Sequence, residues 1–194
     1  MSRTVYRVLS RVFAVVLILV GVGALIGGNF AHSYVTDQLS QEKITMPSGD
    51  ALTTDDMKAA LEKYGDQPMT TGPQAEAYAN HYIYAHMMKS SDGKSYSEVS
   101  SAQGACSKDD AQKDTDECQA LTGLKTTLFQ GDALRGMLLN AYGWWLVGTI
   151  AIWVGIGALV VGVILGGLGW FGLKDKTAGA AGSTSAPTSA GAGA

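Results

Sequence analysis

Two long apolar runs divide the chain, and neither contains a lysine, arginine, aspartate or glutamate. They cover residues 12–36 and 136–173. A helix of about 20 apolar residues crosses the hydrocarbon core of a bilayer, so the first run predicts a transmembrane helix at 12–31. The second run is longer than a bilayer requires. It predicts an interfacial approach segment at 136–143, followed by a transmembrane helix at 144–173.

The first run is also compatible with a cleaved signal peptide, because it lies close to the N-terminus. Its apolar stretch is longer than the usual core of a signal peptide. Cleavage after Ala31 would also require a small residue two positions earlier, where the chain has Asn29. Both features favour an uncleaved membrane anchor.

Basic residues flank the two runs and predict how the chain is oriented. Arginines recur every four residues in a short basic arm, residues 1–11, and lysines follow the second run. Positively charged segments tend to stay in the cytoplasm. We therefore expect a multi-pass protein of the cell membrane with both termini in the cytoplasm and residues 32–135 outside. The residues that determine this topology are Arg3, Arg7, Arg11, Lys174 and Lys176. Binding of the arginine stripe to anionic lipid or to an acidic partner surface is the less favoured alternative.

The segment between the runs predicts a small all-helical domain. Met57, Leu61 and Tyr64 have helical spacing after the possible N-caps Thr53 and Thr54. Two further helices are expected, one over residues 73–88 and one from about residue 119 that continues towards the membrane. The chain has no alternating pattern long enough to predict a strand.

Cys106 and Cys118 are the only cysteines, and both fall in the segment expected outside the cytoplasm. That location favours a disulfide, which would stabilise a small domain by about 3 kcal/mol through loop closure. A metal site is the less favoured alternative, because the chain has no Cys-x-x-Cys pair and no nearby histidine.

Glycines are frequent in both apolar runs. Gly23 and Gly27 form a GxxxG pair in the first run, and Gly162 and Gly166 form another in the second. Small residues at this spacing let two membrane helices approach closely. The pairs therefore predict packing positions, although such pairs are also common by chance in glycine-rich helices.

Composition and charge narrow the possible functions. The net charge is −3 and no basic domain is present, which excludes a typical nucleic-acid-binding protein. Residues 37–132 hold sixteen acids and eight lysines, so this acidic segment is either simply well solvated or able to dock a basic partner. Residues 174–194 are mostly alanine, glycine, serine and threonine and predict a disordered cytoplasmic tail.

The sequence contains no recognisable catalytic or metal-binding constellation. Neither apolar run contains an acid or a basic residue at membrane depth, which argues against ion or proton transport. His81 and His86 are five residues apart and would not share a helix face. No nucleophile elbow, nucleotide-binding loop or haem-attachment motif occurs. We therefore expect no catalytic residue, no metal and no cofactor.

Two segments resemble a known family. They are TLFQGDALRGMLLNAYGWW at residues 127–145 and GPQAEAYANHYIYAH at residues 72–86. Together with the two apolar runs, they are similar to a family of small actinobacterial membrane proteins that often carry a ring-opening dioxygenase label. The residues give that label no support. A non-haem iron site needs two histidines and a carboxylate that converge on the metal. This chain has only three histidines. His32 lies at the membrane edge, and His81 and His86 would not share a helix face.

The resemblance implies a role in respiration. The family includes an accessory subunit of the assembly that joins the cytochrome bc complex (complex III) to cytochrome c oxidase (complex IV). The implied function is that of a non-catalytic structural subunit of this supercomplex. Its partners would be membrane lipid and the larger integral membrane subunits of the two complexes.

The segment before the second transmembrane helix is a candidate docking patch. It combines large apolar residues with few polar groups. This concentration of large apolar residues exceeds what an aromatic membrane anchor requires. The alternative is a plain interfacial entry to the helix. The residues of the patch are Leu134, Arg135, Met137, Leu138, Asn140, Tyr142, Trp144 and Trp145.

The expected fold is thus an all-α membrane protein, a two-helix transmembrane hairpin with a small, disulfide-linked extracytoplasmic domain. An accessory subunit of a larger complex fits this layout best. A free-standing extracytoplasmic sensor or binding module is the first alternative, and an enzyme with an unrecognised site is the second.

Overall fold

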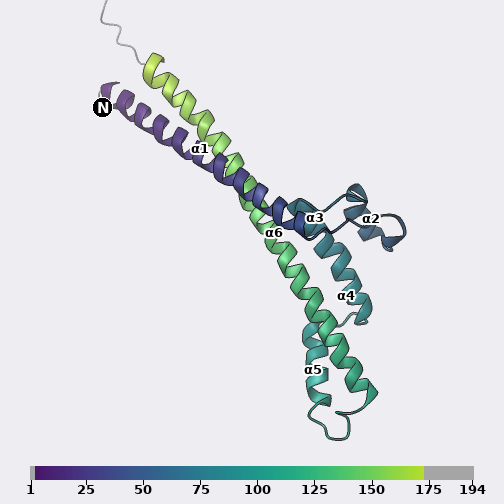
Figure 1. Cartoon of the computed structure of the whole chain (residues 1–194). Helices are drawn as coiled ribbons and strands as arrows, with labels where there is room; N and C mark the ends of the chain where they lie inside the picture. Colours follow the sequence, from purple (N-terminus) through teal and green to yellow (C-terminus); the bar gives the residue numbers. More distant parts are fainter. Residues whose placement is uncertain (1–2, 173–194) are drawn as a thin grey trace, which may run out of the picture. The chain divides into compact units, whose positions relative to one another are not determined.

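The computed structural model describes residues 3–172, and these residues are almost entirely helical (Figure 1). The prediction of an all-helical fold is confirmed for this part of the chain, where the single β-bridge joins Thr45 and Pro68. The predicted tail, Lys174 and Lys176 lie outside the described residues, as does the side chain of Arg3. The elements are α1 (Arg3–Gln41), η1 (Gly49–Ala51), α2 (Asp55–Leu61), η2 (Glu62–Tyr64), α3 (Gly72–Ala77), η3 (Tyr78–Ile83), α4 (Tyr84–Ser90), α5 (Tyr96–Cys106), α6 (Asp116–Gly167) and η4 (Leu168–Gly172).

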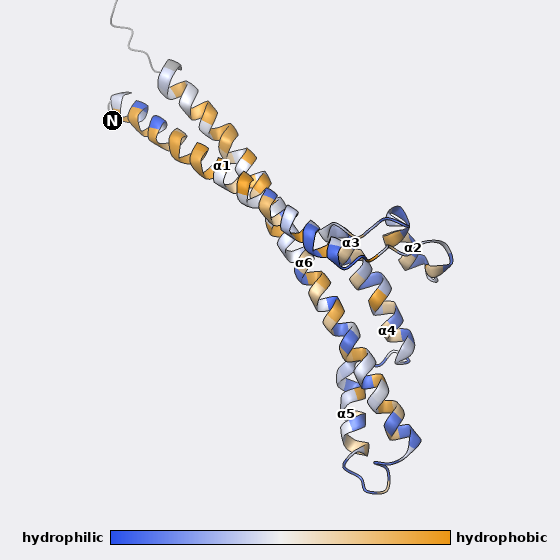
Figure 2. Cartoon of the chain, viewed as in Figure 1, coloured by the Kyte–Doolittle hydropathy of each residue, from blue (hydrophilic) through white to orange (hydrophobic). Residues whose placement is uncertain are grey.

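Helices α1 and α6 are each long and apolar enough to cross a membrane. Their most apolar windows have mean hydropathies of 2.5 and 2.4, and only 11% and 17% of these windows are buried within the protein. Figure 2 shows hydrophobic residues along most of α1 and along the C-terminal part of α6.

Both helices extend beyond the predicted spans. Helix α1 continues past the apolar run to Gln41, and α6 is one uninterrupted helix of 52 residues from Asp116. The expected approach segment, 136–143, is therefore part of α6 and not a separate element. Long helical extensions of this kind are supported by packing in the polar domain, where α1 and α6 both contribute core residues.

The described residues form two compact units. One contains residues 3–22 and 156–172, and the other contains residues 23–155. Within the first unit α1 and α6 pack in antiparallel directions, since Ser10 Oγ donates to the Leu165 carbonyl oxygen at 2.7 Å. Within the second unit they are also antiparallel, because His32 lies against Trp145 and Gly28 against Gly148.

Small buried residues recur every seven positions along both helices. An ideal α-helix does not repeat at seven residues, so this spacing keeps one face on a partner only if the helices wrap slightly around each other. The buried positions are Ala14, Gly21 and Gly28 in α1, Gly148, Gly155 and Gly162 in α6, and Gly169 in η4.

Glycine is required where the two backbones meet. A Cβ at Gly28 would lie 2.6 Å from the Gly148 carbonyl oxygen, and a Cβ at Gly162 would lie 2.9 Å from Ile18 Cγ1. No side chain larger than hydrogen fits at these distances without moving a helix. We call this set of small buried residues the glycine seam.

Only one of the two predicted GxxxG pairs lies at the glycine seam. Gly162 belongs to it, and a Cβ at Gly166 would make an ordinary contact at 3.7 Å with Ala14 Cβ. Gly23 and Gly27 face open space, with nothing within 4 Å of a Cβ at either position. The seven-residue period explains the difference, because it turns Gly28 and not Gly27 towards α6.

Residues 23–155 form a helical domain with a core rich in leucine and methionine. Helices α3 and α4 contact α6 at Trp145 and Gly131, and a disulfide joins α5 to α6, whereas α2 packs against α3 and η3. The fully or almost fully buried side chains include Met46, Leu61, Met69, Val99 and Leu128. Methionine is flexible and fills irregular gaps between short helices.

The first two predicted helices are present, and local caps fix where they begin. Thr54 Oγ1 accepts a hydrogen bond from the Met57 backbone amide at 3.1 Å and caps α2. Thr71 and Gln74 form a reciprocal capping box at the start of α3, which then continues through η3 and α4 to Ser90. Capping satisfies backbone amides that have no partner inside the helix.

Helix α5 was not predicted. It begins with a second capping box, in which Ser95 Oγ accepts from the Glu98 amide and Glu98 Oε2 accepts from the Ser95 amide. Its central Val99 is completely buried. The Ser-x-x-Glu spacing was available in the sequence, but the serine-rich composition of the segment concealed it.

Candidate functional site

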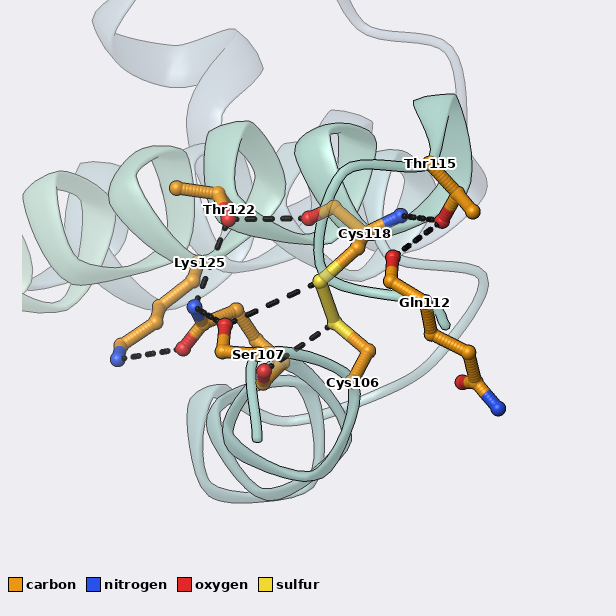
Figure 3. Close-up of a disulfide and its surroundings, with 8 residues drawn as sticks. Cys106, Ser107, Gln112, Thr115, Cys118, Thr122 and Lys125 are labelled. Atoms are coloured by element: carbon orange, nitrogen blue, oxygen red, sulfur yellow. Dashed lines mark hydrogen bonds between the residues drawn. A yellow bond between two sulfur atoms is a disulfide. The ribbon is translucent and has the colours of Figure 1, made fainter. Parts of the chain in front are cut away.

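A disulfide joins Cys106 at the end of α5 to Cys118 in the first turn of α6, as predicted (Figure 3). The two Cα atoms are 5.8 Å apart. Thr115 caps α6 by accepting a hydrogen bond from the Cys118 amide at 3.3 Å. The bridge therefore fastens the outermost turn of α6 to α5.

Polar contacts reinforce this connection one and two turns further along α6. Lys125 Nζ donates to Gln103 Oε1 at 3.1 Å, and Gln103 Nε2 donates to Ser107 Oγ at 2.7 Å. Thr122 Oγ1 donates to the Cys118 carbonyl oxygen at 3.0 Å (Figure 3). These groups all bind one another, so the disulfide region has a structural role.

His32 and Trp145 form an aromatic junction between α1 and α6. Their rings stack with centroids 4.0 Å apart and an angle of 7° between planes. His32 Nε2 lies 3.0 Å from the Trp145 carbonyl oxygen and 3.0 Å from Thr149 Oγ1. A carbonyl oxygen only accepts hydrogen bonds, so Nε2 of His32 is the protonated nitrogen.

Trp145 also lies directly on the start of α3. A Cβ at Gly72 would be 2.3 Å from Trp145 Cβ and 2.5 Å from its Cγ. Glycine is thus the one residue that fits at this position. Through its contacts with His32 and Gly72, the Trp145 side chain connects α1, α3 and α6.

Arg135 points into its own domain and binds the π-helical segment η3. Its Nε donates to the Ala79 carbonyl oxygen at 3.1 Å and its Nη2 to Asn80 Oδ1 at 3.2 Å, while its guanidinium carbon lies 4.7 Å from the centre of the Tyr84 ring. The same Ala79 carbonyl oxygen also accepts the backbone amide of Tyr84 at the end of η3, so it receives two hydrogen bonds. Asp132 Oδ1 lies 3.8 Å from Arg135 Nη1.

The predicted docking patch is divided between interior and surface. Leu138 is buried in the core, and Arg135, Tyr142 and Trp145 are half-buried. The other members are exposed and have spacings of three or four residues, which places them on one face of α6. We call these four residues, Leu134, Met137, Asn140 and Trp144, the exposed strip.

An apolar groove of about 470 Å³ continues from the exposed strip. The aromatic rings of Phe30 and Tyr34 on α1, 6.3 Å apart, lie on one side, and Trp144 on α6 lies on the other. The remaining lining residues are Gly27, Ala31, Val147, Gly148 and Ala151. Gly27, one of the predicted helix-packing positions, also lines this groove.

Phe30 and Tyr34 are surface residues that the sequence analysis did not select. Phe30 is 71% exposed and Tyr34 is 54% exposed. Two aromatic residues four positions apart near the C-terminal end of an apolar run are a signal that could have identified them, because aromatic side chains gather at membrane interfaces.

The two histidines of the second predicted helix bind different groups. His81 Nδ1 lies 2.7 Å from Asp56 Oδ2, and His86 Nδ1 donates to the Tyr82 carbonyl oxygen at 2.7 Å. Within residues 3–172, no cluster of three or more histidine, cysteine or acidic side chains could hold a metal ion.

Tyr78, at the start of η3, has a pKa above its ordinary value. Burial is the larger cause, and the charge of the neighbouring Tyr82 is the second.

No protein-family model, curated protein or solved structure matches this chain. The family resemblance therefore remains a prediction. The function has to be argued from the apolar helices, the exposed strip and the groove.

Proposed function

We propose that this chain is a non-catalytic accessory subunit of a membrane complex. In this proposal α1 and α6 cross the membrane as a hairpin, and the exposed strip and groove pack against larger integral membrane proteins. The observation that carries the proposal is the exposure of Met137, Trp144 and Phe30 on neighbouring surfaces of the helix pair.

Burial supports a membrane environment for both long helices. A soluble protein would bury its most apolar helices in a core, whereas here only 11% and 17% of the two apolar windows are buried. An exposed apolar surface of this length is unfavourable in water and favourable in lipid.

The disulfide supports an orientation with the helical domain outside the cytoplasm. Disulfides persist in oxidising compartments and are rare in the cytosol. The basic arm with Arg7 and Arg11 would then remain in the cytoplasm, consistent with the distribution of positive charge. Both termini would lie on the cytoplasmic side.

Lateral packing explains why the surface residues differ from those at the glycine seam. The seam buries small residues, so α1 and α6 approach each other without large side chains between them. Large side chains remain on the exposed strip and around the groove, where they would contribute most of the contact area with a partner.

The respiratory assignment depends on the resemblance of residues 72–86 and 127–145 to the actinobacterial family. On that basis the partners are subunits of the cytochrome bc complex and cytochrome c oxidase, together with membrane lipid. The chain itself would supply no redox group to the assembly.

Affinity purification in mild detergent tests the proposal. The full chain should bring haem-containing subunits with it in fixed proportion. Replacing Met137 and Trp144 together with alanine should reduce this recovery, because truncating large buried anchors typically costs more than 1 kcal/mol each at an interface. Total haem in the membrane should not change.

Trp153→Ala provides a matched control. Trp153 is 69% exposed on the same helix, and nine residues after Trp144 it faces the opposite side of α6. Recovery of partners should survive this substitution. A monodisperse homo-oligomer with no accompanying protein would contradict the proposal and favour an extracytoplasmic sensor.

Cysteine labelling tests the orientation separately. In a variant with both native cysteines replaced by serine, a single cysteine at Lys58 should react with an impermeant thiol reagent in intact cells. A single cysteine at Ser183 should react only after the cells are opened. Labelling of Ser183→Cys in intact cells would show that the proposed orientation is wrong.

A further inference from the structure

We propose that Arg11 forms a binding site for the phosphate of an anionic phospholipid headgroup on the cytoplasmic side of the membrane. This inference rests on the proposed membrane topology and adds a lipid class and the residue that selects it. It concerns the unit made of residues 3–22 and 156–172.

The first argument is charge complementarity. The described part of this unit contains arginines but no aspartate or glutamate, and the next acid along the chain, Asp175, is flanked by two lysines. Arg11 therefore lies in a unit whose described charged side chains are all positive. A surface with one sign of charge beside a bilayer attracts anionic lipid.

The second argument is that the end of α6 positions Arg11. The Arg11 Nε donates to the Gly169 carbonyl oxygen at 3.0 Å, and the guanidinium carbon lies 5.0 Å from the centre of the Trp170 ring. A Cβ at Gly169 would be 3.0 Å from Arg11 Cγ, so glycine makes room for the arginine stem. The partial negative charge at a helix C-terminus further stabilises a cation at this place.

The third argument concerns the donors that remain. A guanidinium has five N–H groups in a planar fork, and Nε accounts for one of them. The four hydrogens on Nη1 and Nη2 suit the two oxygens of a phosphate, which arginine binds in a bidentate manner. Arg11 is therefore held in place through its Nε, while the end of its side chain retains the geometry for phosphate recognition.

Depth in the membrane agrees with this assignment. Arg11 is the last charged residue before the uncharged run that begins at Val12. Trp170, its stacking partner, is typical of the interface between headgroups and acyl chains. The guanidinium is thus placed at the level of the lipid phosphates and not in the hydrocarbon core.

Native mass spectrometry of the full chain tests the inference. The protein is purified in detergent containing equal amounts of phosphatidylglycerol and phosphatidylcholine, and retained lipids are counted. The wild-type protein should retain phosphatidylglycerol preferentially. Arg11→Gln should lower this preference about fivefold.

Two variants separate charge from structure. Arg11→Lys keeps the positive charge and should retain most of the preference, although it loses the bidentate geometry. Lys58→Gln removes one exposed positive charge in the other unit and should leave the preference unchanged. Equal retention of the two lipids by the wild-type protein, or no change in Arg11→Gln, would overturn the inference.

Further outcomes identify other ligands. Displacement of phosphatidylglycerol by millimolar inorganic phosphate would indicate a free-ion site and overturn lipid selection. Loss of a co-purifying protein in Arg11→Gln, with lipid preference unchanged, would make this a protein contact and also overturn it. Alkaline extraction of membranes tests membrane insertion separately. A chain that is extracted would contradict the proposed function. A chain that stays in the membrane but shows no lipid preference would contradict this inference alone.

Discussion

Replacing Gly72 with alanine tests whether Trp145 organises the helical domain. The change adds one methyl group at the start of α3, where a Cβ would be 2.3 Å from Trp145 Cβ. Non-bonded carbon atoms normally lie about 3.5–4.0 Å apart, so one of the two groups must move by more than about 1 Å. Trp145 has no simple way to move, because its ring stacks on His32 at 4.0 Å.

The expected cost follows from these contacts. Overpacking a close-packed site typically costs about 1–3 kcal/mol. Alanine also gains about 0.5–1 kcal/mol over glycine in a helix, mainly through the entropy of the unfolded chain. Gly123→Ala is a suitable reference because nothing lies within 4 Å of a Cβ there. Both variants share the gain from alanine, so the difference between them isolates the clash.

Thermal unfolding in detergent is the appropriate measurement. Near-UV circular dichroism reports the environment of the tryptophans, and far-UV circular dichroism reports the helices. Gly72→Ala should unfold several degrees below Gly123→Ala, with a reduced tryptophan signal before the transition. Equal unfolding midpoints and an unchanged tryptophan spectrum would refute the proposed role of the Gly72 contact.

Three further predictions concern single features of the fold. Replacing Cys106 and Cys118 with serine should lower the stability of the helical domain by about 3 kcal/mol, measured by thermal unfolding, without affecting membrane insertion; unchanged stability would show that the loop is already restrained. Hydrogen bonds from the backbone amide and the hydroxyl of Ser95 hold the pKa of Glu98 below its ordinary 4.5. The ionised Glu98 therefore stabilises α5 fully above pH 4.5. This stabilisation is lost as the pH falls through the lower pKa of the folded state. The stability difference between wild type and Glu98→Gln should therefore shrink on acidification, and a constant difference would contradict the capping role. Gly162→Leu should separate α1 from α6 and weaken partner recovery in pull-downs while leaving the spectrum of the partner's haem unchanged.

Features encoded by neighbouring residues were accessible from the sequence. The apolar runs, the Thr54 cap of α2, the glycine-rich spans and the pairing of Cys106 with Cys118 each depend on a short pattern or on the only possible partner. The capping box of α5 was equally local. It was missed because a serine-rich segment was interpreted by its composition and not by the Ser95 to Glu98 spacing.

Contacts between distant residues were not accessible in the same way. The clash that requires glycine at position 72 depends on Trp145, which lies 73 residues later. The inward direction of Arg135 depends on the Ala79 carbonyl oxygen, which lies 56 residues earlier in the chain. Neither Gly72 nor Arg135 carries a local signal of its partner. The docking patch was consequently predicted as one surface, although its residues alternate between core and surface.

The period of the small residues decides which surfaces remain for other molecules. A GxxxG pattern selects positions four apart, whereas the buried residues of α1 and α6 recur every seven, at Gly28 in α1 and at Gly148 and Gly162 in α6. With the glycine seam on that face, Gly27 and the aromatic residues around the groove necessarily lie on another. Because α1 and α6 pack against each other through glycine, their large side chains remain on the outer surfaces of the pair. In lipid, contact of such side chains with another protein would be favourable through close packing and not through exclusion of water. Partner binding at the groove should therefore depend on shape at Phe30 and Trp144, so that smaller residues there weaken it even when they are equally apolar.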